Sequence, residues 1–178
     1  SVFPHNYRSV PSNRWLSSKH ECEWAGVECA KQKYVRTISL IAQNIRGKLP
    51  KELKNLKFLS SIRLHWNEFT GTVPEDYGDM QQLKKFEVQF NQLTGTLPDG
   101  FFTNLKELHS LNVGRNFFSG TIPASVNGMD KLSSFYLFSN IFRGQIPDEI
   151  GDLSNLSEFT NCIMSVFVES MLNPSALD

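Results

Sequence analysis

The sequence repeats one unit of about 24 residues five times, and this repeat limits the possible folds more than any other feature. Each copy begins with a short segment in which apolar residues alternate with other residues. A polar residue, an apolar residue two positions later and a Gly follow, and a Pro stands three positions after the Gly. A unit of this size cannot bury its apolar face alone, so neighbouring units must stack into one core. The sequence therefore predicts a solenoid with an extended recognition surface. The spacings of 24, 24, 25 and 24 residues separate the glycines Gly47, Gly71, Gly95, Gly120 and Gly144.

Apolar residues alternate at the start of each copy, as Ile62 and Leu64 do in the second. This period of two indicates a short strand with one buried face, and successive strands are predicted to pair in parallel into one curved sheet. Near-helical spacing after each Pro predicts short helical or 3-10 turns on the convex side. The extra residue of the 25-residue copy predicts a larger convex loop around residues 102–104. A further column is predicted to fill the core: Ile45, Phe69, Leu93, Phe118 and Phe142.

A column of amide side chains follows the predicted strands. An amide can donate to and accept from backbone groups of adjacent turns that a tight coil cannot pair by itself. We therefore predict a structural ladder along the solenoid. Its members are Gln43, Asn67, Asn91, Asn116 and Asn140.

The three cysteines are unevenly placed. Cys22 and Cys29 lie just before the first repeat, whereas Cys162 stands alone near the far end. We predict a disulfide between the first two, in a cap that covers the apolar edge of the first coil, and hence an oxidising compartment. The alternatives are two reduced cysteines or half of a metal site, although no further Cys or His lies at ligand spacing. Cys162 is left as a buried thiol or as a link to another chain or to residues outside this sequence.

Charge and motifs exclude several classes of function. The 18 basic and 18 acidic residues balance, so nucleic acid is not an expected partner. No apolar run reaches the length of a membrane helix, although association with a membrane complex stays open. No nucleophile elbow, phosphate loop or zinc motif is present, so we expect no catalytic residue, no cofactor and no metal ion. The sequence Asn155-Leu156-Ser157 is a candidate acceptor for N-glycosylation.

Residues between and just beyond the buried strand positions are predicted to point outward from the concave sheet. Four of them are the aromatic residues Trp66, Phe90, Tyr136 and Phe138, which are predicted to stand in water. Trp, Tyr and Arg are the residue types enriched at binding hot spots. The alternative is that large side chains tile one another across strands to stabilise the sheet. The predicted partner-binding set is Arg63, His65, Trp66, Glu87, Gln89, Phe90, Asn112, Arg115, Tyr136 and Phe138.

The repeat resembles the plant-type class of extracellular leucine-rich repeats, in which strand leucines precede Asn, a leucine, Gly, Ile or Leu, and Pro. The resemblance covers residues 14–159, because Trp15 and residues 22–29 are similar to the N-terminal cap of the family. It implies an α/β, right-handed leucine-rich-repeat solenoid that binds proteins, peptides or glycans without catalysis. Short members resemble the ectodomains of co-receptor kinases. We expect a cap at 1–34, five repeats at 35–155, and a degenerate repeat with a C-terminal cap or tail at 156–178.

The sequence supports two functional hypotheses. The first is a recognition module, secreted or at the cell surface, that holds a protein or peptide on the concave sheet, with a glycan as a further ligand class. The second is a structural or extrinsic subunit of a larger complex in an oxidising compartment, such as another lumen. Obligate packing would bury both the concave aromatic residues and the tail, whereas a receptor would bind transient ligands.

Overall fold

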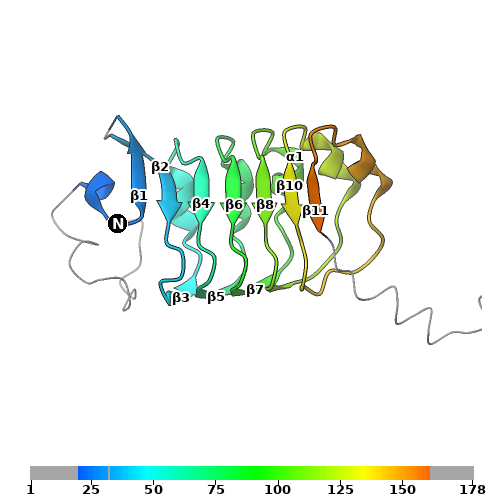
Figure 1. Cartoon of the computed structure of the whole chain (residues 1–178), viewed down its shortest axis with the longest axis horizontal. Helices are drawn as coiled ribbons and strands as arrows, with labels where there is room; N and C mark the ends of the chain where they lie inside the picture. The colour runs from blue at the N-terminus through cyan, green and yellow to red at the C-terminus, as the bar shows by residue number, and fades with distance from the viewer. Residues whose placement is uncertain (1–19, 32, 161–178) are drawn as a thin grey trace, which may run out of the picture.

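The computed structural model describes residues 20–31 and 33–160, which form a right-handed solenoid of stacked coils. One side is a seven-stranded sheet whose strands follow chain order and pair in parallel, except that β1 pairs antiparallel with β2 (Figure 1). A 3-10 turn, η1 (Glu21–Glu23), precedes the first strand. The strands are β1 (Val27–Ala30), β2 (Tyr34–Ser39), β4 (Ser61–Arg63), β6 (Lys85–Glu87), β8 (Ser110–Asn112), β10 (Ser134–Tyr136) and β11 (Glu158–Thr160).

Short helical turns form the convex side, as the sequence predicts. Each begins directly after the Pro of its repeat, whose fixed φ suits the start of a helical turn. Four are 3-10 turns, and the third in chain order is the only α-helix among the described residues. That α-helix lies in the 25-residue repeat, where it accommodates the extra residue. The turns are η2 (Lys51–Asn55), η3 (Glu75–Asp79), α1 (Asp99–Thr103), η4 (Ala124–Gly128) and η5 (Asp148–Asp152).

A second parallel sheet, which the sequence analysis did not predict, runs along the side of the solenoid. Its strands are so short that each buries at most one apolar residue, such as Phe69 or Leu93, and they therefore show no alternation to detect. The repeat Gly lies in or just beyond these strands with φ between 77° and 122°, a region that favours Gly. The strands are β3 (Arg46–Lys48), β5 (Glu68–Gly71), β7 (Gln92–Gly95) and β9 (Phe117–Phe118).

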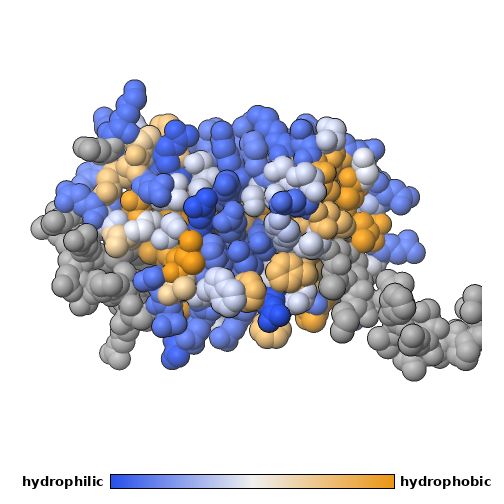
Figure 2. Space-filling view, in the orientation of Figure 1, coloured by the Kyte–Doolittle hydropathy of each residue, from blue (hydrophilic) through white to orange (hydrophobic). Residues whose placement is uncertain are grey.

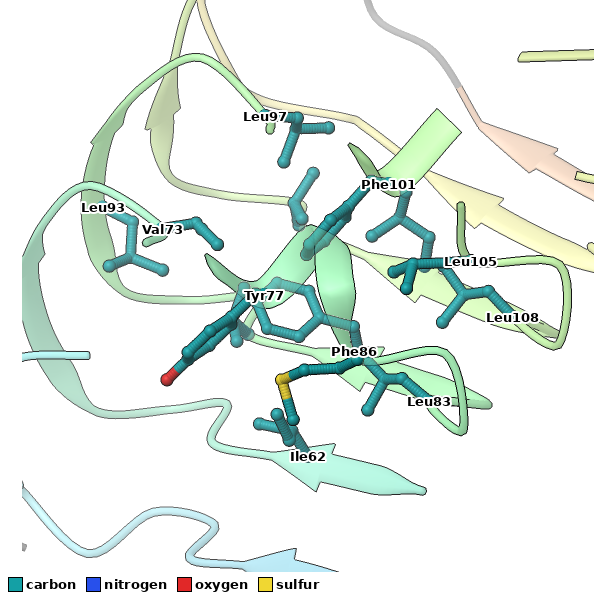
Figure 3. Close-up of a cluster of buried hydrophobic side chains, with 14 of the residues drawn as sticks. Ile62, Val73, Tyr77, Leu83, Phe86, Leu93, Leu97, Phe101, Leu105 and Leu108 are labelled. Carbon is teal, nitrogen blue, oxygen red and sulfur yellow. The ribbon is translucent and has the colours of Figure 1, made fainter. Parts of the chain in front are cut away.

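The core is a continuous column of apolar side chains between the sheets and the convex turns. Figure 3 shows Phe86 from a strand meeting Tyr77 and Phe101 from two convex turns. The rings of Phe86 and Phe101 pack edge to face with centroids 5.1 Å apart. Tyr77 is fully buried, and its hydroxyl donates to the carbonyl of Pro50 at 2.9 Å, so burial leaves this polar atom satisfied.

Asparagine side chains join each coil to the one before it. The Nδ2 of Asn91 donates to the carbonyls of Leu64 and Val88, each at 3.0 Å, and its Oδ1 accepts from the N–H of Phe69 at 2.9 Å. Asn67, Asn116 and Asn140 make the same kind of bonds.

Gln43 differs from the other members of the predicted ladder. Its Nε2 donates to the carbonyls of Ile41 and Ala42 within its own coil. The element that precedes this coil is the cap, whose strand β1 runs antiparallel and offers no matching turn. The first member of the amide column is therefore a local turn contact.

The cap closes the N-terminal end of the solenoid. Cys22 and Cys29 form a disulfide with Cα atoms 5.5 Å apart, which confirms their predicted pairing. Closing a loop of this size contributes about 2.5 kcal/mol in the chain-entropy model. Val27 of β1, which pairs with Ile38 of β2, is buried within the cap.

At the other end, β11 adds a sixth parallel strand to the main sheet. Ile146 is 41% exposed, whereas its counterparts in the four earlier coils are buried, because no further coil covers it among the described residues. The proposals for Trp15, Cys162 and the tail lie outside the described residues. The division at residues 34 and 155 stays a prediction.

Replacing Asn91 with Ala should lower the free energy of unfolding by about 3 kcal/mol, because three buried backbone groups lose their partner. Urea denaturation of both proteins measures the difference. The matched control is Gln92→Ala, at an exposed position one residue away, which should change stability by less than about 0.5 kcal/mol. Equal stability of Asn91→Ala and Gln92→Ala would contradict a structural role for the amide column.

Candidate functional site

The residue before each amide of the ladder column has an unusual backbone conformation. We call these five residues the edge row, because they lie where the strands of the main sheet end. All have φ between 50° and 61°, a left-handed conformation that bulky residues rarely adopt. In this conformation the chain turns out of the sheet toward the second sheet. The edge row is Ala42, Trp66, Phe90, Arg115 and Ser139.

Aromatic rings in and beside the edge row form one cluster. Trp66 and Phe90 stack with centroids 3.6 Å apart and planes 11° from parallel. Phe138 meets Phe90 edge to face at 6.4 Å, and the guanidinium of Arg115 lies 5.3 Å from the Phe90 centroid. Figure 2 shows pale and orange side chains along the lower edge of the sheet, beneath a blue band over the strands.

The aromatic side chains differ in how far they reach solvent, which corrects the prediction that all four stand in water. Trp66 is 54% exposed, whereas Phe90, Tyr136 and Phe138 are half-buried. Parallel strands lie about 4.8 Å apart, close to a ring-stacking distance, so aromatic side chains at matching positions cover one another. Phe90 and Phe138 are therefore covered by ring contacts with residues of neighbouring coils. Trp66 makes such a contact with Phe90 but also faces solvent.

Gly114 makes room for the ring of Phe138. A Cβ atom at Gly114 would lie 2.4 Å from Cε1 of Phe138, a distance that real side chains do not show. Gly114 is itself buried. The close packing at Gly114 was not predicted from the sequence. Its one sequence signal is that the matching positions in the other repeats, which also point outward, carry larger residues.

A polar floor lies on the sheet beside the aromatic cluster, formed by Arg63, His65, Glu87 and Gln89. The Nε of Arg63 lies 3.5 Å from Oε2 of Glu87, an ion pair that makes no hydrogen bond at that nitrogen. Nδ1 of His65 and Oε1 of Gln89 are buried without a hydrogen-bond partner among the described residues. Such atoms are candidates to bind a ligand or water, because unsatisfied buried polar groups are costly.

Burial lowers the pKa of His65 below its ordinary value of 6.5. The Arg63 guanidinium lowers it further, and the Glu87 carboxylate opposes this shift. The imidazole is therefore neutral at neutral pH and can either donate or accept a hydrogen bond.

The far end of the face is held by hydrogen bonds. The hydroxyl of Tyr136 bonds to the carboxylate of Glu158, which also accepts from Ser134 at 3.0 Å. The bond to Glu158 raises the pKa of Tyr136, and the two bonds lower the pKa of Glu158. Asn112 accepts from the N–H of Gly114 at 3.2 Å. All ten predicted partner-binding residues thus lie on one face, but Tyr136 and Asn112 are already engaged within the protein.

No group of three or more His, Cys, Asp or Glu side chains within the described ranges could hold a metal ion. Nor does the described part contain a helix long and apolar enough to cross a membrane.

Sequence reasoning missed a second exposed aromatic pair, Tyr34 and Phe58, whose ring centroids lie 4.5 Å apart. The sequence signal for this pair was Phe58, because the matching positions in the next three repeats are polar. They are Gln82, Glu107 and Lys131.

Gly114→Ala should lower the free energy of unfolding by about 1–3 kcal/mol, because the new methyl group overlaps the Phe138 ring. In the Phe138→Ala background the same change should cost less than about 0.5 kcal/mol, since the overlap is gone. A double-mutant cycle from chemical denaturation measures this coupling. Equal costs in both backgrounds would show that Phe138 does not lie over Gly114.

The free energy of unfolding should rise with pH across the window just below 6.5, because the unfolded chain there binds a proton that folded His65 does not. The stability that neutral His65 contributes is complete above this window and is lost as the pH falls through it. Denaturation curves at several pH values, compared with those of His65→Gln, isolate this slope. A difference between the two proteins that is independent of pH would contradict the lowered pKa.

Comparisons with known proteins agree with this architecture. Residues 81–142 match the family described as leucine rich repeat. The chain is similar to a chain of the PEPR1–AtPEP1 crystal structure, with 32% identity and a TM-score of 0.68 over 70% of this chain and 18% of that one. The chain thus spans under a fifth of the length of that protein. The sequence has no match among curated proteins.

Two further structures match most of this chain. One is the BIR3–SERK2 complex from Arabidopsis thaliana, with 27% identity and a TM-score of 0.70 over 86% of this chain and 83% of that one. The other is the Arabidopsis receptor kinase HAESA with the peptide hormone IDA and the co-receptor SERK1. It has 27% identity and a TM-score of 0.66 over 83% of this chain and 29% of that one. With its repeats, its parallel sheets and its N-terminal disulfide, the chain has the leucine-rich-repeat solenoid fold and is similar to plant receptor and co-receptor ectodomains.

Proposed function

We propose that this protein is a non-catalytic recognition module that binds a protein or peptide on the outer face of the main sheet. The proposed site consists of the edge row and the polar floor. The single observation that carries the proposal is Trp66, whose side chain is 54% exposed and yet held in place by its stack on Phe90. An exposed aromatic residue that is already ordered loses little conformational entropy on binding.

The residues around Trp66 support binding in two further ways. Arg115 is exposed and lies against Phe90, so a cation stands beside the apolar cluster. Aromatic and Arg side chains in such an arrangement are those that most often dominate interface energies. The buried, unpartnered atoms of His65 and Gln89 supply hydrogen-bonding groups that a partner could satisfy.

Similar proteins support the same class of function. The HAESA structure contains the peptide hormone IDA and the co-receptor SERK1, and BIR3 is solved in complex with SERK2, which favours a binding role over an enzymatic one. The disulfide favours an oxidising compartment, and we infer that the protein acts outside the cell or at its surface. Glycosylation at Asn155 would fit that location. The side chain is exposed, and its Nδ2 donates to the carbonyl of Asp130 at 2.6 Å; the modification would replace one of the two hydrogens on this nitrogen.

A structural subunit is the second candidate function, and one observation favours it. Phe117 and Ile141 occupy matching positions on adjacent coils and are 53% and 54% exposed, away from the main sheet. Two large apolar side chains at neighbouring exposed positions suit a permanent contact. A protein of this kind would be recovered in one constant complex, with contacts centred on Phe117 and Ile141.

The test is affinity capture from the native source with cross-links mapped by mass spectrometry, followed by affinity measurement on variants. Trp66→Ala should weaken binding of the captured partner about thirtyfold, as expected for a hot-spot aromatic residue. Its stability should change by less than about 1 kcal/mol, since one stacking contact is lost. Phe58→Ala is the matched control, because Phe58 is 51% exposed at the opposite edge of the sheet and should leave affinity unchanged.

The two candidate functions predict different outcomes. Cross-links beside Arg63, Glu87 and Arg115 with loss of affinity in Trp66→Ala support the recognition module. Full affinity in Trp66→Ala, with cross-links centred on Phe117 and Ile141, would overturn it in favour of the structural subunit.

A further inference from the structure

The edge row leaves one face of the Trp66 indole uncovered. Phe90 covers the face toward the third coil, so the other face points toward the first coil, where the matching residue is Ala42. Ala42 has φ 54°, close to the 61° of Trp66, so the Cα–Cβ bonds of the two residues point in the same direction. The side chain of Ala42 consists of this one methyl group. We call the free indole face, Ala42 and the partly exposed Ile41 the shelf. It has the position that a third stacked ring would occupy.

The chemistry of the shelf favours an apolar ring. The N–H of Ala42 donates to the carbonyl of His65 at 3.1 Å. The carbonyls of Ile41 and Ala42 accept from Gln43. These three main-chain groups of the shelf are therefore already paired, whereas a sugar would need hydrogen-bonding groups for its hydroxyls. The side chain of Phe, Tyr or Trp needs only the apolar surfaces.

The other end of the aromatic cluster offers a positive charge. Arg46 and Arg63 form ion pairs with Glu68 and Glu87. Arg115 is exposed, lies against Phe90 and has no ion pair within the described part of the chain. An Arg whose planar face rests on a ring keeps its N–H groups directed outward to bind a carboxylate.

The repeat fixes the distance between these two features. Ala42 and Arg115 are three coils apart, which is about 14 Å at the usual spacing of parallel strands. An extended peptide rises about 3.4 Å per residue and directs alternate side chains to opposite sides. Residues at positions i and i+4 therefore point to the same side about 14 Å apart, which matches the shelf and Arg115.

We propose that the edge row binds an extended peptide segment that places an aromatic side chain on the shelf and an Asp or Glu, four residues away, on Arg115. This inference rests on the proposed function and names the ligand chemistry of that site. Charge complementarity at Arg115 and the paired main-chain groups of the shelf favour an acidic, aromatic peptide over a glycan.

The test uses synthetic peptides with blocked ends and NMR titration of the whole chain, observed at the Trp66 indole N–H. The probe is Tyr-Ser-Gly-Ser-Asp, together with the reverse sequence, because either chain direction satisfies the spacing. Replacing Tyr by Leu, or Asp by Asn, should weaken binding about tenfold each, as should Tyr-Ser-Gly-Asp, whose acid faces the opposite side.

Two matched variants locate the ring. Ala42→Trp should fill the shelf and weaken the Tyr peptide about tenfold, while binding of the Leu peptide stays the same. Phe58→Trp introduces the same side chain at the opposite edge of the sheet, outside the edge row, and should leave binding of the Tyr peptide unaffected. Arg115→Gln should remove the preference for Asp over Asn and keep the preference for Tyr over Leu. Unchanged amide spectra away from the substitution show that each variant folds.

Several outcomes would overturn the inference. They are the absence of saturable binding by either peptide, equal binding of Tyr and Leu peptides, or full binding to Ala42→Trp. Titration of the Trp66 signal by oligosaccharides in place of peptides would replace it with a glycan site. Contacts from residues 1–19 of this chain to the Trp66 ring would assign the shelf to the protein itself. None of these outcomes decides the proposed function, which depends on the captured partner and Trp66→Ala.

Discussion

The hydrogen bonds of the ladder asparagines are the interaction on which the rest of the structure depends. Each Asn joins the carbonyl of its own strand to that of the preceding coil, and so fixes the rise from one coil to the next. To bring the amide inside, the residue before it must turn the chain in the left-handed conformation. The same bonds that hold the core together therefore direct the edge row outward. The proposed recognition surface is therefore a consequence of the hydrogen bonds that join successive coils.

The coil spacing has a second effect on that surface. Because matching residues on adjacent coils lie about 4.8 Å apart, aromatic residues in one column must stack. A column of unlike residues forms a surface whose side-chain chemistry changes from coil to coil. Here the column changes from Ala42 through two rings to Arg115. Stacking gives Trp66 a fixed orientation, which lowers the entropic cost of binding. The coil spacing that stabilises the sheet thus also orders the side chains of the proposed site.

Much of the fold could be predicted from the sequence because the repeat spacing reports the coil directly. The strand positions, the convex turns and the pairing of Cys22 with Cys29 each have a local signal. The second sheet had none, since each of its strands buries at most one apolar side chain. The outward direction of the ten site residues follows from alternation, but their exposure does not. Phe138 is half-buried because Gly114 lets its ring lie flat, a contact between adjacent coils that no single repeat reveals.

The edge row is also where the sequence departs from local preference. Asn or Gly would adopt φ near 60° with little strain, whereas Trp66 and Phe90 hold bulky rings there. Residues that break a local rule at a cost in stability are expected at functional sites, where the cost is offset by binding. Stacking between the two rings recovers part of this cost, but it cannot explain why Trp66 leaves half of its surface in water. A partner for the free indole face would explain this exposure, whereas tiling of the two rings alone does not.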